Sequence, residues 1–192
     1  MQFWRRSSAI RIAGEQGDNV LADAERAARL GRPSWRSQSL KIRRAVPADA
    51  VEICALHKAS IRGVCSQTYP EAQIRIWVEP LEPDSYLSAM ERFEFYVAEQ
   101  DGILGFSMLN VEGAELNAIY IHPDAIGRGV GRKLLDFSER LAKRMSVRSL
   151  KLKATLNAVG FYEACGFKRG DMSTHRTRRG LELPCVEMTK DL

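Results

Sequence analysis

Glycine and basic residues are concentrated between residues 122 and 135, where Gly127, Gly129 and Gly131 alternate with larger side chains. Glycine has no Cβ atom, so its backbone adopts positive φ angles and a ligand can approach it closely. An amphipathic helical pattern begins at Val130. The first N–H groups of a helix have no partner within it and lie at the positive end of the helix dipole. This combination is typical of an anion site, above all for a phosphate. Three side chains add mobile positive charge: Arg128, Arg132 and Lys133.

The spacing of the glycines excludes the two common nucleotide-binding motifs. The P-loop requires Ser or Thr directly after its lysine, whereas Leu134 follows Lys133 here. The dinucleotide fingerprint requires a glycine in its sixth position, which is Arg132 counted from Gly127 and Leu134 counted from Gly129. Taken alone, these residues leave two interpretations open. One is a phosphate site, and the other is a strand-to-helix turn in which glycine serves packing only.

The periodicity of apolar residues predicts the elements that position this loop. A period of two predicts a strand, and a period near 3.6 predicts a helix. Strands are expected over residues 40–46, 93–99, 103–111, 114–121, 150–154, 167–171 and 183–190. Helices are expected over residues 47–61, 70–77, 84–92, 130–145 and 157–165, with Pro70 in a first helical position. Tight turns are expected at Asp101-Gly102 and Glu112-Gly113. This order predicts an α+β (mixed α/β) domain with helices on the faces of its sheet.

Two blocks of the sequence resemble the GNAT superfamily of N-acetyltransferases. The acetyl-CoA loop of that family is written Q/R-x-x-G-x-G/A, and residues 126–131 match it after the strand and exit IYIHPDA. The later stretch KLKATLNAVGFYEACGFKRG resembles the second block of the family. One departure is Ile126, which stands where the family has Gln or Arg. The resemblance spans residues 40–192 and implies a central mixed, mostly antiparallel sheet flanked by helices, with splayed fourth and fifth strands.

The resemblance implies acetyl-CoA as the co-substrate. Backbone amides of residues 127–132 are expected to hold its diphosphate. The backbone of Ile119 and Ile121 is expected to pair with its pantetheine arm, to which Asn157 donates a hydrogen bond; the alternative for Asn157 is a helix cap. The expected cofactor-binding residues are Ile119, Tyr120, Ile121, Ile126, Gly127, Arg128, Gly129, Val130, Gly131, Arg132, Asn157 and Phe161.

Acetyl transfer to an amine needs a base for the acceptor and a proton donor for the departing thiolate. The resemblance implies Glu115 as the base and Tyr162 as the acid, with backbone N–H near Ile119 or Ile121 stabilising the oxyanion. The alternatives are an exposed strand carboxylate for Glu115 and a core aromatic residue for Tyr162.

The acceptor pocket is the least defined part of the expected site. In the family the first two helices often line it, which points to Tyr69, Gln73 and Trp77. Their spacing of four is equally that of a helix face packed on the core. His122 and Cys165 are weaker candidates for catalysis. A lone histidine just after a strand is usually structural or exposed, and Cys165 has no partnered His in its local sequence.

Charge is distributed unevenly along the chain. Residues 40–125 hold seven Lys and Arg against thirteen Asp and Glu, whereas residues 126–179 hold fourteen against four. The basic part suits the phosphates of coenzyme A, and the acidic part favours a cationic acceptor. Nucleic-acid binding through Arg176, Arg178, Arg179 and the basic residues of 140–153 ranks last, because aromatic residues do not interleave with them.

Length and composition set the broad class. A chain of 192 residues that is 45% hydrophobic is expected to form one acetyltransferase domain over residues 40–192, preceded by an extension over residues 1–39 with one short helix at 20–30. Apolar runs fall short of the roughly 18 residues of a membrane helix. The four cysteines are scattered without a C-x-x-C pair, which favours a cytoplasmic protein without a metal site.

These observations lead to one main hypothesis and two alternatives. The main one is an acetyl-CoA-dependent N-acetyltransferase that acts on a primary amine of a small molecule or peptide by direct attack in a ternary complex. The first alternative is a catalytically inactive acyl-CoA-binding sensor or interaction module, and the second is nucleic-acid binding. No membrane partner is expected, and a homodimer stays open.

Overall fold

The computed structural model describes residues 39–177 and 180–192. The helix expected at residues 20–30 and the basic residues Arg178 and Arg179 lie outside this range. Seven strands form one sheet in the order β1-β2-β3-β4-β5-β7-β6. The strands are β1 Lys41–Arg44, β2 Glu94–Glu99, β3 Ile103–Asn110, β4 Glu115–Ile121, β5 Ser149–Thr155, β6 Lys168–Arg176 and β7 Glu182–Asp191.

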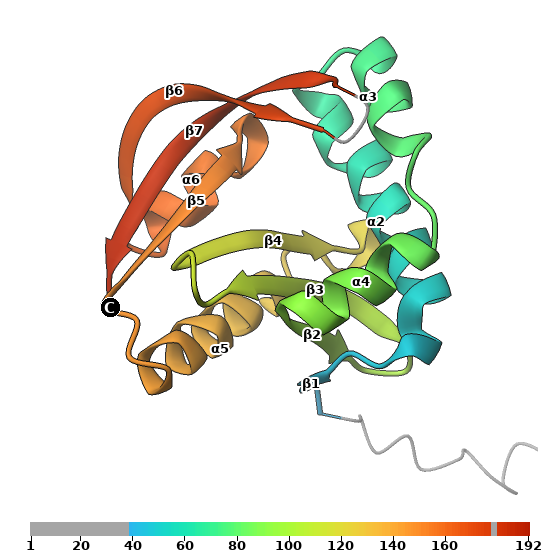
Figure 1. Cartoon of the computed structure of the whole chain (residues 1–192). Helices are drawn as coiled ribbons and strands as arrows, with labels where there is room; N and C mark the ends of the chain where they lie inside the picture. Colours follow the sequence, from blue (N-terminus) through green and yellow to red (C-terminus); the bar gives the residue numbers. More distant parts are fainter. Residues whose placement is uncertain (1–38, 178–179) are drawn as a thin grey trace, which may run out of the picture. The chain divides into compact units, whose positions relative to one another are not determined.

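The sheet divides between β4 and β5 (Figure 1). Every other neighbouring pair is antiparallel along its length, whereas β4 and β5 are parallel and share the single register pair Glu115 and Lys151. Beyond that pair the two strands diverge, so β1 to β4 form one part of the sheet and β5, β7 and β6 the other. The mixed, mostly antiparallel sheet with splayed fourth and fifth strands is therefore confirmed.

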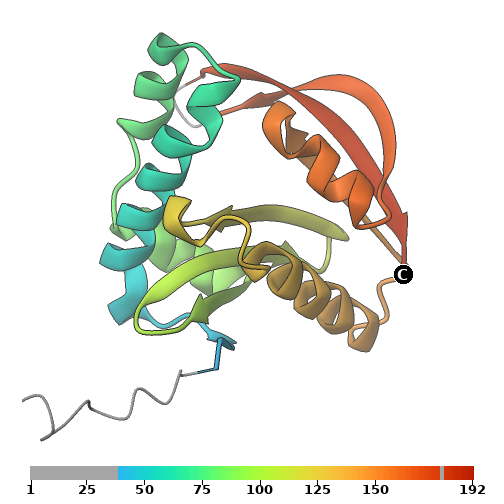
Figure 2. The same ribbon diagram turned by 180° about the vertical axis from the view of Figure 1, so that it is seen from behind.

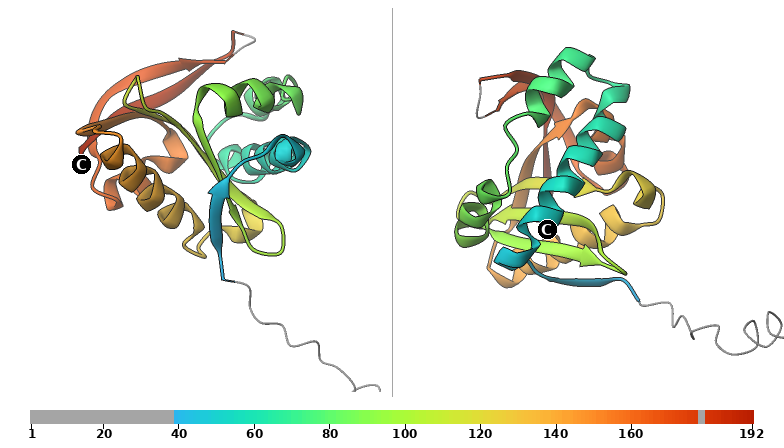
Figure 3. Two further views of the ribbon diagram at one scale, coloured as in Figure 1. Left: turned by 60° about the horizontal axis from the view of Figure 1, so that its bottom comes forward. Right: turned by 90° about the vertical axis from the view of Figure 1, so that its right-hand side faces the viewer.

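Helices cover both faces of the sheet. On one face α2 packs against β3 and β4, and α4 packs against β2. On the other face α5 packs against β2, β3 and β4, and α6 packs against β5 and β6. Figure 2 shows α5 and α6 in front of the sheet, and the left view of Figure 3 shows them on the side opposite to α2 and α4. The helices are α2 Ala50–Gly63, α3 Glu71–Val78, α4 Asp84–Arg92, α5 Val130–Arg144 and α6 Val159–Ala164.

The buried face of α5 follows the helical period. Its buried residues recur at intervals of three and four: Val130, Leu134, Leu135, Ser138, Leu141 and Ala142. Met145, which the sequence pattern places on this face, is 45% exposed because the helix ends at Arg144. In α2 the residues Ile53, Leu56 and Ser60 lie on one helical face and are buried, whereas Val51 is 69% exposed.

The backbone conformation of single residues sets the turns of two hairpins and the start of one helix. Asp101 and Gly102 have φ angles of 54° and 121° and connect β2 to β3, as their sequence predicts. In the next turn the positive φ, 50°, falls on Ala114 and not on Gly113. Pro70, the predicted first helical residue, is instead the N-cap of α3 with extended backbone, and the helix begins one residue later at Glu71.

Strand β4 contains a β-bulge that its alternating sequence does not reveal. Leu109 of β3 pairs with Leu116, and the next residue, Met108, pairs with Ala118, so Asn117 is an extra residue in β4. Bulges increase local twist and redirect side chains, and they occur often beside functional sites. Within the described residues, no helix is both long and apolar enough to cross a membrane.

Candidate functional site

The glycine loop forms a ready anion cradle at the start of α5. Gly127 and Gly129 both have a φ angle of 77°, which side chains rarely adopt, and Gly129 is the N-cap of the helix. The first bond within the helix is donated by Lys133 N–H to the Gly129 carbonyl oxygen at 3.1 Å. The N–H groups of residues 129–132 therefore have no partner within the helix, and no side chain caps it.

The space beside these amides is open. A Cβ atom built on Gly127 or Gly129 would meet no atom within 4 Å, whereas one built on Gly131 would lie 3.5 Å from Phe161. Free donors, a positive helix end and open space fit a diphosphate group. These observations agree with the expectation that the loop holds the diphosphate of acetyl-CoA.

Strand β4 offers a second row of free backbone groups. His122 donates its N–H to the Leu104 carbonyl oxygen of β3 at 2.9 Å. Along an antiparallel strand, every second residue directs its backbone N–H and C=O to the same neighbouring strand, and the residues between them direct theirs to the other side. The polar groups of Tyr120 consequently face β3, and those of Ile119 and Ile121 face the β5 side. Because β5 has diverged there, these groups are available to an extended ligand arm.

A cavity of about 470 Å³, called the loop cavity below, joins the glycine loop to this strand. It lies between the end of α2, β4, the start of α5 and α6. The predicted cofactor residues that line it are Ile119, Tyr120, Ile121, Ile126, Gly127, Gly129, Val130, Gly131, Arg132, Asn157 and Phe161. Arg128 is the exception, and its guanidinium instead contacts the Gln100 side-chain oxygen at 3.3 Å.

Tyr162 also lines the loop cavity. It is buried and packs edge-to-face on Phe161 and Phe167. Burial raises the pKa of its hydroxyl, so the group stays protonated at neutral pH and can donate a proton. Asn157 is exposed in the 3-10 turn Leu156–Ala158, and neither this turn nor α6 has a side-chain cap. The alternative role of Asn157 as a helix cap is therefore excluded.

A second cavity of about 390 Å³, called the aromatic cavity below, lies between α2, α4, β4 and the β5–β7 part of the sheet. Glu115, Tyr69 and Trp77 line it, but Gln73 lines neither cavity. The Tyr69 hydroxyl donates to the Pro184 carbonyl oxygen at 2.6 Å and accepts from Leu156 N–H at 3.0 Å. Tyr69 therefore ties the segment before α3 to the end of β5 and to β7.

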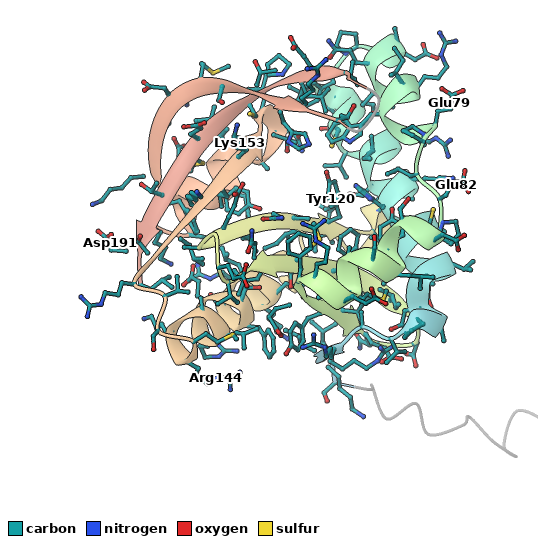
Figure 4. The ribbon with its side chains drawn as sticks, in the orientation of Figure 1. Glu79, Glu82, Tyr120, Arg144, Lys153 and Asp191 are labelled. Carbon is teal, nitrogen blue, oxygen red and sulfur yellow. The ribbon has the colours of Figure 1, made fainter. Side chains whose placement is uncertain are left out.

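The two cavities meet where the sheet divides. Tyr120 and Thr155 line both of them and come from the two diverging strands, β4 and β5. Figure 4 shows the labelled Tyr120 and Lys153 on either side of this opening. Tyr162 lies on the loop side of the junction and Glu115 on the aromatic side. A donor bound in one cavity and an acceptor bound in the other would approach each other here.

His57 is a site residue that the sequence analysis missed. Its Nδ1 lies 2.9 Å from the Tyr86 hydroxyl oxygen, and its ring lies against Phe106 and Tyr120. Its Nε2 is buried and has no hydrogen-bond partner among the residues that the structure describes. Burial lowers its pKa to about 3, so the ring is neutral at physiological pH. The sequence feature that could have identified His57 is its position on the inward face of α2, four residues after the buried Ile53.

The sequence analysis also missed three basic residues as lining residues of the aromatic cavity: Lys153, His175 and Arg176.

Two weaker catalytic candidates have structural surroundings. His122 accepts the Asp124 N–H through Nδ1 at 3.3 Å and so shapes the loop. Cys165 is buried, and desolvation raises the pKa of its thiol despite the nearby Arg132. Across residues 39–177 and 180–192, no cluster of His, Cys, Asp or Glu could hold a metal ion.

Comparisons with known proteins agree with this geometry. The family model of the acetyltransferase (GNAT) domain matches residues 91–169. The peptidyl-lysine N-acetyltransferase YjaB of Salmonella typhimurium is 29% identical over 126 residues, which are 66% of this chain and 71% of that protein. YjaB of Escherichia coli is 29% identical over 131 residues, which are 67% of this chain and 82% of that protein.

Solved structures share the same fold. A GCN5-related N-acetyltransferase from Rhodopseudomonas palustris has a TM-score of 0.75 at 27% identity, over 81% of this chain and 98% of that chain. The PaiA N-acetyltransferase of Thermoplasma acidophilum, solved in complex with coenzyme A, has a TM-score of 0.64 at 21% identity, over 81% of this chain and 100% of that chain. At 21% identity, the match to the PaiA structure shows a shared fold and nothing more.

Proposed function

Because this chain belongs to the GNAT acetyltransferase family, we propose that it transfers the acetyl group of acetyl-CoA to a primary amine of a small molecule or peptide. One observation carries the proposal. The loop cavity, with its open helix start, meets the aromatic cavity at Tyr120 and Thr155. Two ligands bound in these adjacent cavities would lie close to each other at the shared residues, as direct transfer in a ternary complex requires.

The loop cavity would hold acetyl-CoA, which supplies the activated acetyl group. The N–H groups of residues 129–132 would donate to its diphosphate, and the backbone of Ile119 and Ile121 would bond its pantetheine arm. Ile126 is 53% exposed beside this cradle. Its apolar side chain offers no hydrogen bond, so binding depends on backbone donors.

Two side chains are assigned to proton transfer. Glu115 lines the cavity of the acceptor and would take a proton from its ammonium group, directly or through water. Tyr162 remains protonated because it is buried, and its hydroxyl would donate to the departing sulfur. The assignment places base and acid on opposite sides of the junction.

Thiol release from acetyl-CoA in the presence of an amine panel tests the function. Glu115→Gln and Tyr162→Phe are each expected to lower kcat about 100-fold, since each removes one proton-transfer group. Glu112→Gln and Glu163→Gln are matched controls, because these carboxylates are exposed and line neither cavity. Both controls should keep full activity.

Calorimetry with acetyl-CoA separates the enzyme from a binding module. Binding without thiol release above background, across the whole panel, would support an inactive acyl-CoA sensor. Absence of binding to folded protein would refute the cradle itself.

A further inference from the structure

Building on the proposed function, we propose that the acceptor is a free α-amino acid with a bulky apolar or aromatic side chain. It would lie in the aromatic cavity with its amine toward Glu115 and its carboxylate toward Lys153 and Arg176.

The charge of the cavity argues against polycationic acceptors. Among the described residues that line it, Glu115 is the single carboxylate, against the cations Lys153 and Arg176. Several other acidic groups of residues 40–125 are paired away from this cavity. For example, Asp49 pairs with Arg43 at 2.7 Å, and Glu52 accepts the Ile103 N–H at 2.6 Å. A polyamine would therefore find one anionic partner beside two repelling cations.

The positions of the charged groups fit an amine and a carboxylate on one carbon. Glu115 is the register partner of Lys151 across the parallel pair, and Lys153 follows two residues later on the same face of β5. His175 lines the same cavity as Lys153 and Glu115. Burial and Lys153 lower its pKa, whereas Glu115 raises it. An anionic and a cationic side chain, from β4 and β5, therefore line one cavity where the sheet divides.

The two cations are available to a ligand. Within residues 39–177 and 180–192, the Lys153 ammonium has only long contacts, at 3.6 Å to Glu187 and 3.5 Å to the Thr174 carbonyl oxygen. The Arg176 side chain makes no hydrogen bond or ion pair with any residue that the structure describes. A carboxylate can therefore bind here without displacing a strong internal ion pair.

The remaining wall suits an apolar body. It is made mainly of aromatic and aliphatic side chains, including Trp77, Leu81, Phe95, Phe106, Met108 and Leu183. The volume of about 390 Å³ lies within the usual range of small-molecule sites. The unpartnered Nε2 of His57 adds one polar contact in this wall. A lysine side chain of a protein has neither a carboxylate beside its amine nor a ring to fill this space.

Acetylation of matched amines tests the inference. With saturating acetyl-CoA, kcat/KM is measured for L-phenylalanine, L-phenylalaninamide, phenethylamine and a lysine peptide with a blocked N-terminus, and products are identified by mass. The kcat/KM of L-phenylalanine is expected to exceed that of L-phenylalaninamide about tenfold, because only the acid carries a carboxylate that the two cations can bind. The amine of the amide loses its proton more readily, so amine ionisation cannot create this preference.

Variants identify the groups that read the carboxylate. Lys153→Met and Arg176→Met are each expected to reduce the ratio of kcat/KM for phenylalanine to that for its amide about fivefold. The effect is modest because ion pairs of exposed charges are weak. Lys168→Met removes the same charge from β6 at a side chain that is 78% exposed and lines neither cavity, so it should keep the preference.

The outcomes distinguish this inference from the proposed function. Efficient acetylation of the lysine peptide or phenethylamine, without a preference for phenylalanine, overturns the acceptor assignment while acetyl transfer stands. If no amine is acetylated although acetyl-CoA binds, the proposed function fails and the inference fails with it.

Discussion

His57 should make the folded protein sensitive to mild acid. Its ring lies among Tyr86, Phe106 and Tyr120, and burial lowers its pKa from 6.5 to about 3. The unfolded chain exposes this ring to water, where it takes up a proton near its ordinary pKa. Between these two pKa values the unfolded state binds the extra proton, so the unfolding free energy falls as the pH falls. The stability from neutral His57 is complete above about pH 6.5 and is lost toward about pH 3.

The size of this effect follows from the two pKa values. Each full pH unit inside the window removes about 1.4 kcal/mol of unfolding free energy. From about pH 7 to about pH 5, the expected loss from His57 is about 2 kcal/mol. That is a large part of the ~5–15 kcal/mol that stabilises a typical domain.

His57→Asn removes the titrating ring and retains a polar group near the position of Nδ1, which contacts Tyr86 at 2.9 Å. Urea unfolding of both proteins at the two pH values gives their unfolding free energies. The wild-type protein should lose about 2 kcal/mol more than the variant. Any offset from packing or helix propensity is independent of pH and cancels, and His175 is present in both proteins. Equal losses would refute the reasoning, because they would mean that His57 is protonated alike in both states.

Two further substitutions test the cradle and the tie between elements. Gly129→Ala should weaken acetyl-CoA binding about tenfold in calorimetry, because a Cβ at a φ of 77° is strained and enters the open space beside the amides. Gly160→Ala, also in open space but helical, should leave binding unchanged; equal effects would contradict the role of the loop. Tyr69→Phe should lower the unfolding free energy by about 1–3 kcal/mol in urea, because Pro184 and Leu156 lose a shared partner. An unchanged urea midpoint would show that these bonds add no net stability.

Features determined by neighbouring residues could be predicted from the sequence. The hairpin at Asp101-Gly102 depends on two residues that tolerate positive φ, and the structure has it there. The anion cradle also depends on adjacent residues, since Gly129 both allows the turn and begins α5. The resemblance added the split between β4 and β5, which no local pattern contains.

The aromatic cavity could not be predicted, because its wall is assembled from distant segments. His57, Tyr86, Phe106 and Tyr120 come from α2, α4, β3 and β4 and meet only through packing. Periodicity identifies the inward face of a helix but not the element that covers it. For that reason Gln73 was placed in the site together with Trp77, although only Trp77 lines the cavity.

Charge totals along the chain do not determine the charge of the site, for a similar reason. The acidic first half of the chain favours a cationic acceptor only if its carboxylates face the acceptor. The structure instead pairs Asp49 and Glu99 with Arg43, and Glu94 with Arg44, away from the cavity. Among the described residues, the carboxylate that lines the cavity, Glu115, shares it with basic groups from β5 and β6. The net charge of a site therefore depends more on which ion pairs form in the folded protein than on the composition of a segment.

The bulge at Asn117 connects the two halves of the site. Strict alternation in β4 would place Glu115 and Tyr120 on opposite faces of the sheet. One extra residue reverses the alternation, as any one-residue slip does. Leu116 and Ile119 therefore both pack toward the core beside α5, while Tyr120 turns to the α2 side and joins Glu115 in the aromatic cavity. The same reversal directs Ile121 toward the loop cavity. A single extra residue thus directs side chains toward the proposed acceptor site on one face and toward the proposed acyl-donor site on the other.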